Sequence, residues 1–417
     1  MPEILIDKVG SLGDGMGQLN NQTVFVPSTL AGERVNASGE SPRLRLDEII
    51  EASPDRVEPL CKHFGTCGGC SLQHMSPEKM LLWKQAEVAL AFSRAKLDVE
   101  IEPCIPSPAH SRRRVTFTAR RNGSDVTLGF NERGSNDVVN ITQCPILMPE
   151  IEAQFDGFRA LATTLLRGNE DIQITINGCD NGLDLDFSLE QVPTEDMLAA
   201  FVRAFAKTPF LRAALDGDVI VEKEKPFVTF GRAKVEVPSG GFLQAVIPAE
   251  EAMAELVCNH LKKRKRVVDL YSGSGTFSLR LAITARVHAV ETEAKALTAL
   301  ASAVGADGLK SITTEIRDLE ELPLMASELK LFDGVCLDPP RAGAEPQIGE
   351  IAKADIRSLV YVSCNPTTLA RDAAVLVKAG YKIERIVPVD QFLFSPHIEV
   401  VALFSKKPEK ANRSIFR

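Results

Sequence analysis

The chain has 417 residues, of which 44 % are hydrophobic and 25 % are charged, as in ordinary globular proteins of two or three domains. No run approaches about 18 uninterrupted apolar residues, and the N-terminus has no basic stretch followed by an apolar one, so we expect a cytoplasmic protein without a membrane partner. The net charge of −8 argues weakly against a nucleic-acid partner, although a basic stripe can still hold phosphates. In a reducing compartment, the nine cysteines favour metal binding or catalysis over disulfides.

Residues 1–53 predict a small β-barrel. Short β-branched runs alternate there with glycine-rich turns such as LGDGMGQLNN. About 50 residues make only a thin core, so we expect this domain to pack on its neighbour. After a turn-rich linker and a cysteine cluster, residues 78–97 carry apolar side chains at the spacing of a helix.

Residues 54–240 predict a central α+β domain. Several stretches, such as RVTFTARR and LDLDFSL, alternate apolar and polar residues. This alternation is typical of a mostly antiparallel sheet with one face in water. One helix is expected near residues 194–207.

Residues 241–417 predict an α/β domain. Near-continuous apolar strands such as KRVVDLY and SLVYVS alternate with helices. This is the pattern of a Rossmann-like, doubly wound and mostly parallel sheet. The helix at 78–97 is a candidate to pack on this domain, although it precedes the central one.

The sequence VVDLYSGSGTFSLRLA predicts a strand, a glycine loop and a helix. Gly273 and Gly275 permit a tight turn and close backbone approach. Glu291 follows at the tip of the next strand, where a carboxylate can hold ribose hydroxyls. Alone this pattern is weak, because dinucleotide-binding folds share it.

Polar or special residues end each strand of the predicted parallel sheet. Ligands of such sheets bind outside the carboxyl ends of the strands, so these residues should share one rim. Any one of them could merely cap a helix or make a turn, but five in this order are hard to explain that way. The rim comprises the loop 269–275, Glu291, Asp318, Asp338 and Cys364.

The motif LDPPR and two later motifs carry a family resemblance. Amino-methyltransferases typically place an aromatic residue after the two prolines, whereas Arg341 follows here, which favours carbon methylation. DPPRAG, VSCNPTTLARD and PHIEVVALF resemble the S-adenosylmethionine-dependent RNA uracil-C5 methyltransferase family, in particular its 23S rRNA branch. The resemblance covers nearly the whole chain. It implies an OB-like or TRAM-like barrel and the formation of 5-methyluridine.

The resemblance assigns Cys364 of SCNP as the nucleophile and Glu399 of PHIEV as the base. A thiolate that adds to uracil C6 makes C5 reactive toward a methyl sulfonium, and a base must then remove the C5 proton. Without the resemblance, Cys364 would more often be a small buried side chain. Glu399 could equally be an exposed position on a strand.

We expect the surroundings of Cys364 to activate its thiol. A thiol with a pKa of about 8.5 is mostly protonated at neutral pH, so a helix N-terminus or a cation is needed to lower that pKa. Thr367 or Thr368 is expected to cap the following helix, and Arg341 is a candidate cation. His397, on the same strand face as the base, either assists catalysis or only makes a hydrogen bond.

S-adenosylmethionine is the cofactor that the resemblance implies. The sequence departs from the family pattern at Tyr271, where phenylalanine is usual but an aromatic contact is kept. It also departs at Thr276, where asparagine is usual, and we leave Thr276 out of the site. The expected cofactor contacts are Gln244, Tyr271, Gly273, Gly275, Glu291, Asp318 and Asp338.

Four cysteines form a candidate metal site. Cys61, Cys67 and Cys70 lie close together with glycines between them, and Cys144 comes from ITQCPIL. On physical grounds these thiolates fit a zinc ion and an iron–sulfur cluster equally well. The resemblance implies a [4Fe–4S] cluster, which would tie the exit of the barrel to the central domain.

The segment HSRRRVTFTARR holds five arginines and no acid. On a strand, alternate arginines share a face and could form a ridge for phosphates, with Phe117 between them. Such a run is most often just a solvated face, but the neighbouring barrel favours RNA binding. The candidate RNA contacts are Arg112, Arg113, Arg114, Arg120 and Arg121.

We expect a monomer that methylates a uridine of 23S rRNA. The RNA should be single-stranded or a loop, because the base must leave any stack to reach the nucleophile. One alternative is the same reaction on a tRNA loop, but that branch generally lacks the barrel and the cysteine cluster. Another is a non-catalytic RNA-binding iron–sulfur protein, against which the intact Cys364, Glu399 and Asp338 argue.

Overall fold

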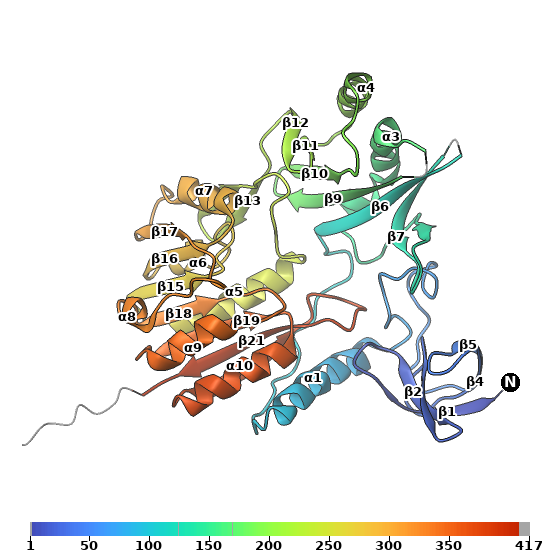
Figure 1. Ribbon diagram of the computed structural model, residues 1–417, viewed down its shortest axis with the longest axis horizontal. Coiled ribbons are helices and arrows are strands. Elements are labelled where there is room, and N and C mark those ends of the chain that lie inside the picture. Colours follow the sequence, from blue (N-terminus) through green and yellow to red (C-terminus); the bar gives the residue numbers. More distant parts are fainter. Residues whose placement is uncertain (1, 124, 169, 408–417) are drawn as a thin grey trace, which may run out of the picture.

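The computed structural model describes residues 2–123, 125–168 and 170–407, so the last ten residues of the predicted C-terminal domain lie outside the described residues. The described chain forms a five-stranded sheet, two seven-stranded sheets and a two-stranded hairpin (Figure 1). Within these ranges, none of the helices combines the length and the apolar character that a membrane span requires.

The predicted N-terminal barrel is confirmed. Its antiparallel strands follow the order β3-β2-β1-β4-β5, and a bridge from Phe25 to Arg43 joins β3 to the chain before β5. Outside the barrel, Trp83 of helix α1 (Pro77–Arg94) donates a hydrogen bond to the Val9 carbonyl oxygen at 3.4 Å. The small barrel therefore packs against α1, as expected for a domain with a thin core. The strands are β1 (Glu3–Val9), β2 (Gly15–Leu19), β3 (Gln22–Val26), β4 (Arg34–Ser38) and β5 (Arg45–Glu51).

Helix α1 packs on the C-terminal domain. Its N-terminus is capped by the hydroxyl of Ser76. It ends before the predicted position 97 because Lys96 takes a positive φ of 61°. Its buried face contacts strand β20 (Lys382–Val389) and helix α10 (Pro366–Lys378), and Figure 1 shows α1 beside α10.

The central domain is a mostly antiparallel sheet in the order β12-β11-β10-β9-β6-β7-β8, as predicted, with β10 and β11 parallel. Helix α4 (Glu195–Phe205) confirms the expected helix. The sequence did not predict helix α3 (Phe155–Leu165), although its buried residues recur at helical spacing. The other elements are α2 (Pro149–Glu152), β6 (Arg114–Asn122), β7 (Asp125–Asn131), β8 (Val138–Asn140), β9 (Asp171–Cys179), β10 (Gly182–Ser188), β11 (Arg212–Leu215) and β12 (Asp218–Glu222).

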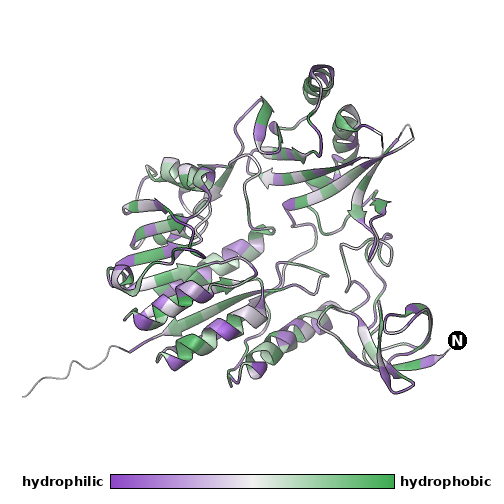
Figure 2. Cartoon of the chain, in the orientation of Figure 1, coloured by the Kyte–Doolittle hydropathy of each residue, from purple (hydrophilic) through white to green (hydrophobic). Residues whose placement is uncertain are grey.

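The C-terminal domain confirms the doubly wound, mostly parallel sheet. Its order is β17-β16-β15-β18-β19-β21-β20; the first five strands are parallel and β21 is antiparallel to both neighbours. Figure 2 shows that β21 is mostly hydrophobic, as expected of a strand covered on both faces. The strands are β15 (Arg266–Leu270), β16 (Arg286–Glu291), β17 (Ile312–Ile316), β18 (Gly334–Leu337), β19 (Ser358–Ser363), β20 and β21 (Glu399–Ser405). The helices are α5 (Ile247–Leu261), α6 (Ser278–Leu281), α7 (Ala294–Ala303), α8 (Ala326–Leu329), α9 (Glu345–Lys353) and α10.

A short hairpin just before the predicted domain boundary packs on the C-terminal domain. Strands β13 (Phe227–Phe230) and β14 (Ala233–Glu236) pair only with each other, and their apolar side chains are buried against α7. The sequence placed these residues in the central domain because they alternate like its other strands. They pack instead with the C-terminal domain.

Candidate active site

The ends of three neighbouring strands bring Asp338, Cys364 and Glu399 together. Asp338 follows β18, Cys364 follows β19, and Glu399 begins β21. In the antiparallel β19–β21 ladder Ser363 pairs with Val400, so the next two residues, Cys364 and Glu399, are neighbours across the strands. Strand β18 runs parallel to β19 on its other side, which sets Asp338 beside them. The predicted rim therefore brings these three side chains to one place.

The glycine loop between β15 and α6 needs its glycines. Gly273 and Gly275 have φ angles of 53° and 96°, in the region that other residues rarely adopt. A Cβ atom on Gly275 would also lie 2.5 Å from Cδ1 of Leu300. Tyr271 itself has a positive φ of 60°, an uncommon backbone conformation for so large a residue.

Glu291 holds this loop against the end of β16. Its Oε2 accepts the backbone N–H of Gly273 at 2.9 Å. Its Oε1 accepts the N–H groups of Thr292 and Glu293 at 2.7 and 3.0 Å. The carboxylate therefore shapes the loop, in addition to lying at the edge of the cavity next to it.

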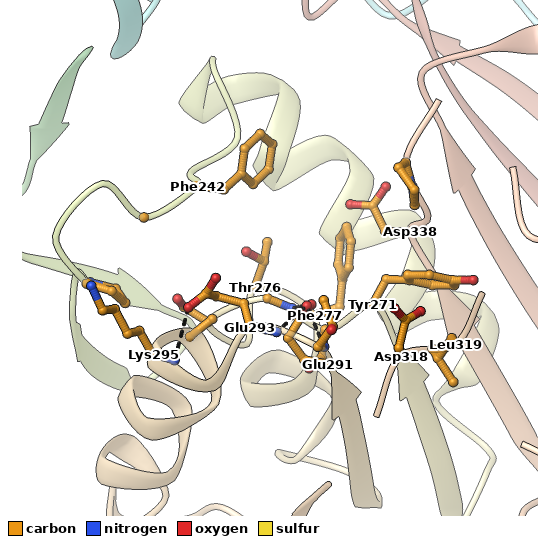
Figure 3. Close-up of a pocket in the computed structure, with 18 of the residues that line it drawn as sticks. Phe242, Tyr271, Thr276, Phe277, Glu291, Glu293, Lys295, Asp318, Leu319 and Asp338 are labelled. Atoms are coloured by element: carbon orange, nitrogen blue, oxygen red, sulfur yellow. Dashed lines mark hydrogen bonds between the residues drawn. The ribbon is translucent and has the colours of Figure 1, made fainter. Parts of the chain in front are cut away.

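A cavity of about 650 Å³ opens over the glycine loop. Small-molecule sites measure roughly 300–1,000 Å³, so a nucleoside cofactor fits this volume. Figure 3 shows Phe242 and Asp338 on one side of the cavity and Glu291 and Asp318 on the other. Gly275 shapes the turn beneath it, and the other expected cofactor contacts line it: Gln244, Tyr271, Gly273, Glu291, Asp318 and Asp338.

The groups around the cavity suit S-adenosylmethionine. A Cβ atom on Gly273 would meet nothing within 4 Å, so the loop leaves open space for a ligand. Carboxylates at Glu291 and Asp318 can accept hydrogen bonds from hydroxyl or amino groups. An ionised Asp338 would favour the positive sulfonium over a neutral sulfur.

Several lining residues were missed by sequence reasoning. Thr276 was left out because it departs from the family pattern, yet it lines the cavity. Phe242 is an aromatic side chain that is 64 % exposed, with the guanidinium of Arg114 lying 5.3 Å from its ring centre. The feature of the sequence that could have pointed to Phe242 is its position in a loop, two residues before Gln244. Phe277, Lys295 and Leu319 also line the cavity.

A chain of hydrogen bonds links the cavity to Glu399. The side-chain amide of Gln244 donates to Oδ2 of Asp338 at 3.0 Å. Gln391 donates from Nε2 to Oε1 of Gln244 at 2.9 Å and to Oε1 of Glu399 at 3.2 Å. All four residues are buried or nearly so, which places two carboxyl groups in a region of low polarity.

These surroundings raise the pKa values of the reactive groups. Burial raises the pKa of Asp338 to about 7, helped by the Asp269 carboxylate. Burial and the nearby Asp338 also raise the pKa of Glu399 well above its ordinary value. For Cys364, burial and then Glu399 and Asp338 raise the pKa to about 11, although Arg341 acts in the opposite direction. The prediction of a lowered thiol pKa is therefore wrong, because burial and two neighbouring carboxylates outweigh the effect of Arg341.

The helix after Cys364 is capped by Asn365, not by a threonine. The side-chain oxygen of Asn365 accepts the N–H of Thr367 at 3.1 Å, and its amide nitrogen donates to the Arg341 carbonyl oxygen at 3.0 Å. The hydroxyl of Thr368 donates to the same carbonyl oxygen at 3.3 Å. These bonds tie the DPPR and SCNP segments together.

His397 does not share a strand face with Glu399. Strand β21 begins at Glu399, so His397 belongs to the preceding loop, and its side chain is exposed. Its ring packs edge-on against Phe392, with the ring centres 6.1 Å apart.

The loop before β21 is held by two distant segments. Lys84 of α1 forms a fully buried ion pair with Asp390 and donates to the Phe392 carbonyl oxygen at 2.9 Å. The backbone N–H groups of residues 71 and 72 donate to the Phe394 carbonyl oxygen at 2.8 and 3.0 Å. The segment that carries Cys70 therefore touches the loop that leads to Glu399.

The four predicted cluster cysteines line one small cavity. Burial raises the pKa of Cys70 to about 11 and that of Cys144 to about 12, and the neighbouring thiols, including Cys61 and Cys67, add to both shifts. Within the described residues, no three His, Cys, Asp or Glu side chains lie close enough together to hold a single metal ion.

The predicted arginine ridge does not form. Arg113 is 3 % exposed; it donates to Oε2 of Glu250 at 2.5 Å and to the Gln244 carbonyl oxygen at 3.0 Å. Arg120 forms a two-pronged ion pair with Asp171 at 2.6 and 2.7 Å. Both acids come from distant parts of the sequence, which is why a local charge count did not reveal these pairs.

Two other arginines of this segment also have hydrogen-bond partners. Arg121 donates to two carbonyl oxygens at the end of α3, and Arg112 donates to the Arg114 carbonyl oxygen at 2.9 Å. Phe117 is fully buried in the central core, so the expectation that it lies on an RNA-binding ridge is wrong. The partly exposed Arg112 and Arg114 stay predicted RNA contacts.

Comparison with known families agrees with this geometry. Residues 212–407 match the family described as tRNA (Uracil-5-)-methyltransferase, and residues 2–38 match the TRAM domain. An uncharacterized RNA methyltransferase of Brucella suis is 44 % identical over 405 residues, covering 97 % of this chain and 98 % of the relative. The 23S rRNA (uracil(1939)-C(5))-methyltransferase RlmD of Vibrio vulnificus is 29 % identical, with 97 % and 96 % covered.

A solved structure shares the whole architecture. The Pyrococcus abyssi tRNA (uracil-54, C5)-methyltransferase, in complex with S-adenosyl-L-homocysteine, superposes with a TM-score of 0.75 at 22 % identity, covering 96 % of this chain and 99 % of that one. A tRNA enzyme can therefore have this architecture, so the architecture alone does not decide between rRNA and tRNA. Full-length similarity to RNA methyltransferases, together with the family match over the domain that holds the cavity, shows that this chain belongs to the S-adenosylmethionine-dependent RNA (uracil-C5) methyltransferase family.

Proposed function

We propose that this protein methylates C5 of a uridine in 23S rRNA, with Cys364 as nucleophile and Glu399 as base. The observation that carries the proposal is the position of these two residues at the adjacent ends of β19 and β21, beside Asp338, which lines the cavity. A protein that only bound RNA would need neither a thiol nor a buried carboxylate there.

The residues account for each bond of the reaction. The Cys364 thiolate adds to uracil C6, and the electron pair of the C5–C6 double bond moves toward O4 as an enolate. C5 then forms a bond to the methyl group that S-adenosylmethionine supplies, and the S–CH₃ electron pair stays on sulfur. Glu399 removes the C5 proton, the C5–C6 double bond re-forms, and Cys364 leaves as a thiolate.

The raised pKa of Glu399 suits its role. A carboxylate in water is a weak base, whereas burial makes Glu399 a stronger proton acceptor. The same burial makes the Cys364 thiol hard to ionise, so its proton must be lost before attack. Arg341, which favours the thiolate, is the nearby cation that supports this loss.

For the four cysteines we propose a [4Fe–4S] cluster rather than zinc. Zinc–sulfur bonds of about 2.3 Å in a tetrahedron place the sulfurs roughly 3.8 Å apart. The four cysteines line one small cavity, which is compatible with either group, so the choice of a cluster rests on the resemblance of the sequence to the 23S rRNA branch. Iron and sulfide analysis of anaerobically purified protein tests this: stoichiometric zinc without iron would exclude it.

The choice of 23S rRNA rests on the full-length similarity to the Vibrio enzyme. The archaeal tRNA enzyme has a similar fold at lower sequence identity. The description of the family that matches residues 212–407 also names tRNA. Methylation of a tRNA loop is therefore the second candidate.

Mass spectrometry of RNA from a deletion strain decides between them. We expect 5-methyluridine to disappear from 23S rRNA, to return with the wild-type gene, and not to return with Cys364→Ala. Loss from tRNA alone would favour the second candidate. Unchanged 5-methyluridine in both RNAs would exclude both.

A further inference from the structure

Gln391 is a buried glutamine between the cofactor cavity and Glu399. Its side chain is 2 % exposed, and its Nε2 donates to Oε1 of both Gln244 and Glu399, at 2.9 and 3.2 Å. Gln244 in turn donates to Asp338 at 3.0 Å. Burial shields these bonds from competition with water.

The partners of Gln391 fix the direction of its amide. An ionised carboxylate and an amide oxygen can only accept hydrogen bonds, so the nitrogen of Gln391 must face both. Its own oxygen, Oε1, is left buried without a partner in the described chain. An unpaired buried acceptor is unfavourable, so the two acceptors, and not Oε1, set the orientation.

One oxygen of Glu399 is thereby held and the other is free. Oε1 accepts from Gln391, whereas Oε2 is buried and has no partner among the described residues. The hydrogen bond from Gln391 favours the ionised carboxylate, while burial and the charge of Asp338 oppose it. A base that removes a carbon-bound proton needs this ionised form and a free lone pair.

Lys84 fixes the backbone on both sides of Gln391. It forms the buried ion pair with Asp390 on one side and donates to the Phe392 carbonyl oxygen, at 2.9 Å, on the other. The side chain of Gln391 is therefore directed by an anchored loop, as a precisely placed polar group requires.

We propose that Gln391 is a positioning residue that holds one oxygen of Glu399 and leaves the other directed at the C5 proton. This inference rests on the proposed function, in which Glu399 is the base. It assigns Gln391 to the last step, in which Glu399 takes the proton, the C–H electron pair re-forms the C5–C6 double bond, and Cys364 departs with the electrons of the C6–S bond. Without the amide of Gln391 the earlier steps still proceed, and the covalent adduct between the enzyme and the methylated RNA accumulates.

The test compares turnover with adduct formation in Gln391→Met, which keeps the size of the side chain but removes the amide. Full-length protein is incubated with methyl-labelled S-adenosylmethionine and total RNA from the deletion strain, and the labelled protein–RNA adduct is measured on denaturing gels. We expect turnover to fall about 10- to 100-fold, as for the loss of a hydrogen bond to a charged group, while the adduct fraction rises.

A matched control is Gln347→Met. Gln347 is also fully buried, but both of its hydrogen bonds are to the backbone of Leu324. We expect Gln347→Met to lower stability without adduct accumulation. If Gln391→Met lowers turnover with no more adduct than wild type, or leaves turnover unchanged, the inference is wrong. If it does not fold, Gln391→Asn, which shifts the amide by one methylene, is judged by the same two measurements.

Two further variants separate this inference from the proposed function. Glu399→Gln should accumulate adduct and Cys364→Ala should form none. If either fails while wild type methylates RNA, the assigned chemistry is wrong. If both behave as expected and Gln391→Met forms no extra adduct, only the role of Gln391 is rejected.

Discussion

The rim of the C-terminal sheet and the arginine segment of the central domain both concentrate polar residues, but only the rim brings them to one surface. At the rim, parallel strands end side by side, so strand order alone places Asp338 beside Cys364. In the arginine segment, three guanidinium groups bind partners elsewhere in the fold: those of Arg113, Arg120 and Arg121. A charged residue in a sequence therefore indicates a site only where the topology also fixes its neighbours.

Removing the nucleophile should have the largest effect of any change at the rim. We expect Cys364→Ala to lower methyl transfer by about 10⁴-fold or more, because no other step of the reaction can begin. Stability should change little, since the side chain is only partly buried. Methyl incorporation into RNA and thermal unfolding of the same preparation measure both effects. Methyl transfer by this variant at nearly the wild-type rate would contradict the assignment, because the rim would then not be the catalytic site.

In the arginine segment, the largest effect should be on folding. Arg113→Met leaves Glu250, which is 2 % exposed, with Arg280 as its one charged partner among the described residues. Breaking a buried ion pair typically costs about 3–5 kcal/mol, and urea unfolding would measure the loss. Arg120→Gln on the same segment is the control: its pair is partly exposed, so a loss below about 1 kcal/mol is expected. Equal losses would mean that burial does not distinguish the two arginines.

The sequence predicted those features that depend on local pattern. Alternating apolar residues identified the sheets, and the strand ends identified the glycine loop, Glu291, Asp318 and Asp338 at the cavity, whereas Gln244 came from the family resemblance. It did not predict contacts between residues far apart in the chain. Gln391 bonds to Gln244, which lies 147 positions away in the sequence, and burial, followed by the carboxylate of Glu399, raises the pKa of Cys364 against the expected direction. Such effects arise from packing, which periodicity does not encode.

A buried carboxyl group beneath the rim should make stability depend on pH. Burial raises the pKa of Asp269 from 3.8 to about 7. The unfolded chain therefore loses this proton at lower pH than the folded one, and stability falls as pH rises from about 4 to 7, by up to about 4 kcal/mol. Asp269→Asn, which can still accept the bond from Ser278, should flatten this fall in urea unfolding measured across the window. An unchanged slope would show that Asp269 is ionised in the fold.

The smallest expected effect concerns Phe242, which lines the cofactor cavity and contacts Arg114 of the arginine segment. Phe242 is 64 % exposed and lies beneath Arg114, so its ring can stack on an unpaired base while the guanidinium stays near the phosphates. Stacking contributes about 1–3 kcal/mol per base, so Phe242→Ala should raise the KM for RNA roughly 5- to 150-fold with stability unchanged. Phe242→Trp, which keeps an aromatic face, should retain most of the affinity. Because Phe242 also lines the cofactor cavity, the KM for S-adenosylmethionine must be measured in the same variants. If only the KM for S-adenosylmethionine rose, Phe242 would contact the cofactor and not RNA. The arginine segment would then have no contact that contributes to catalysis.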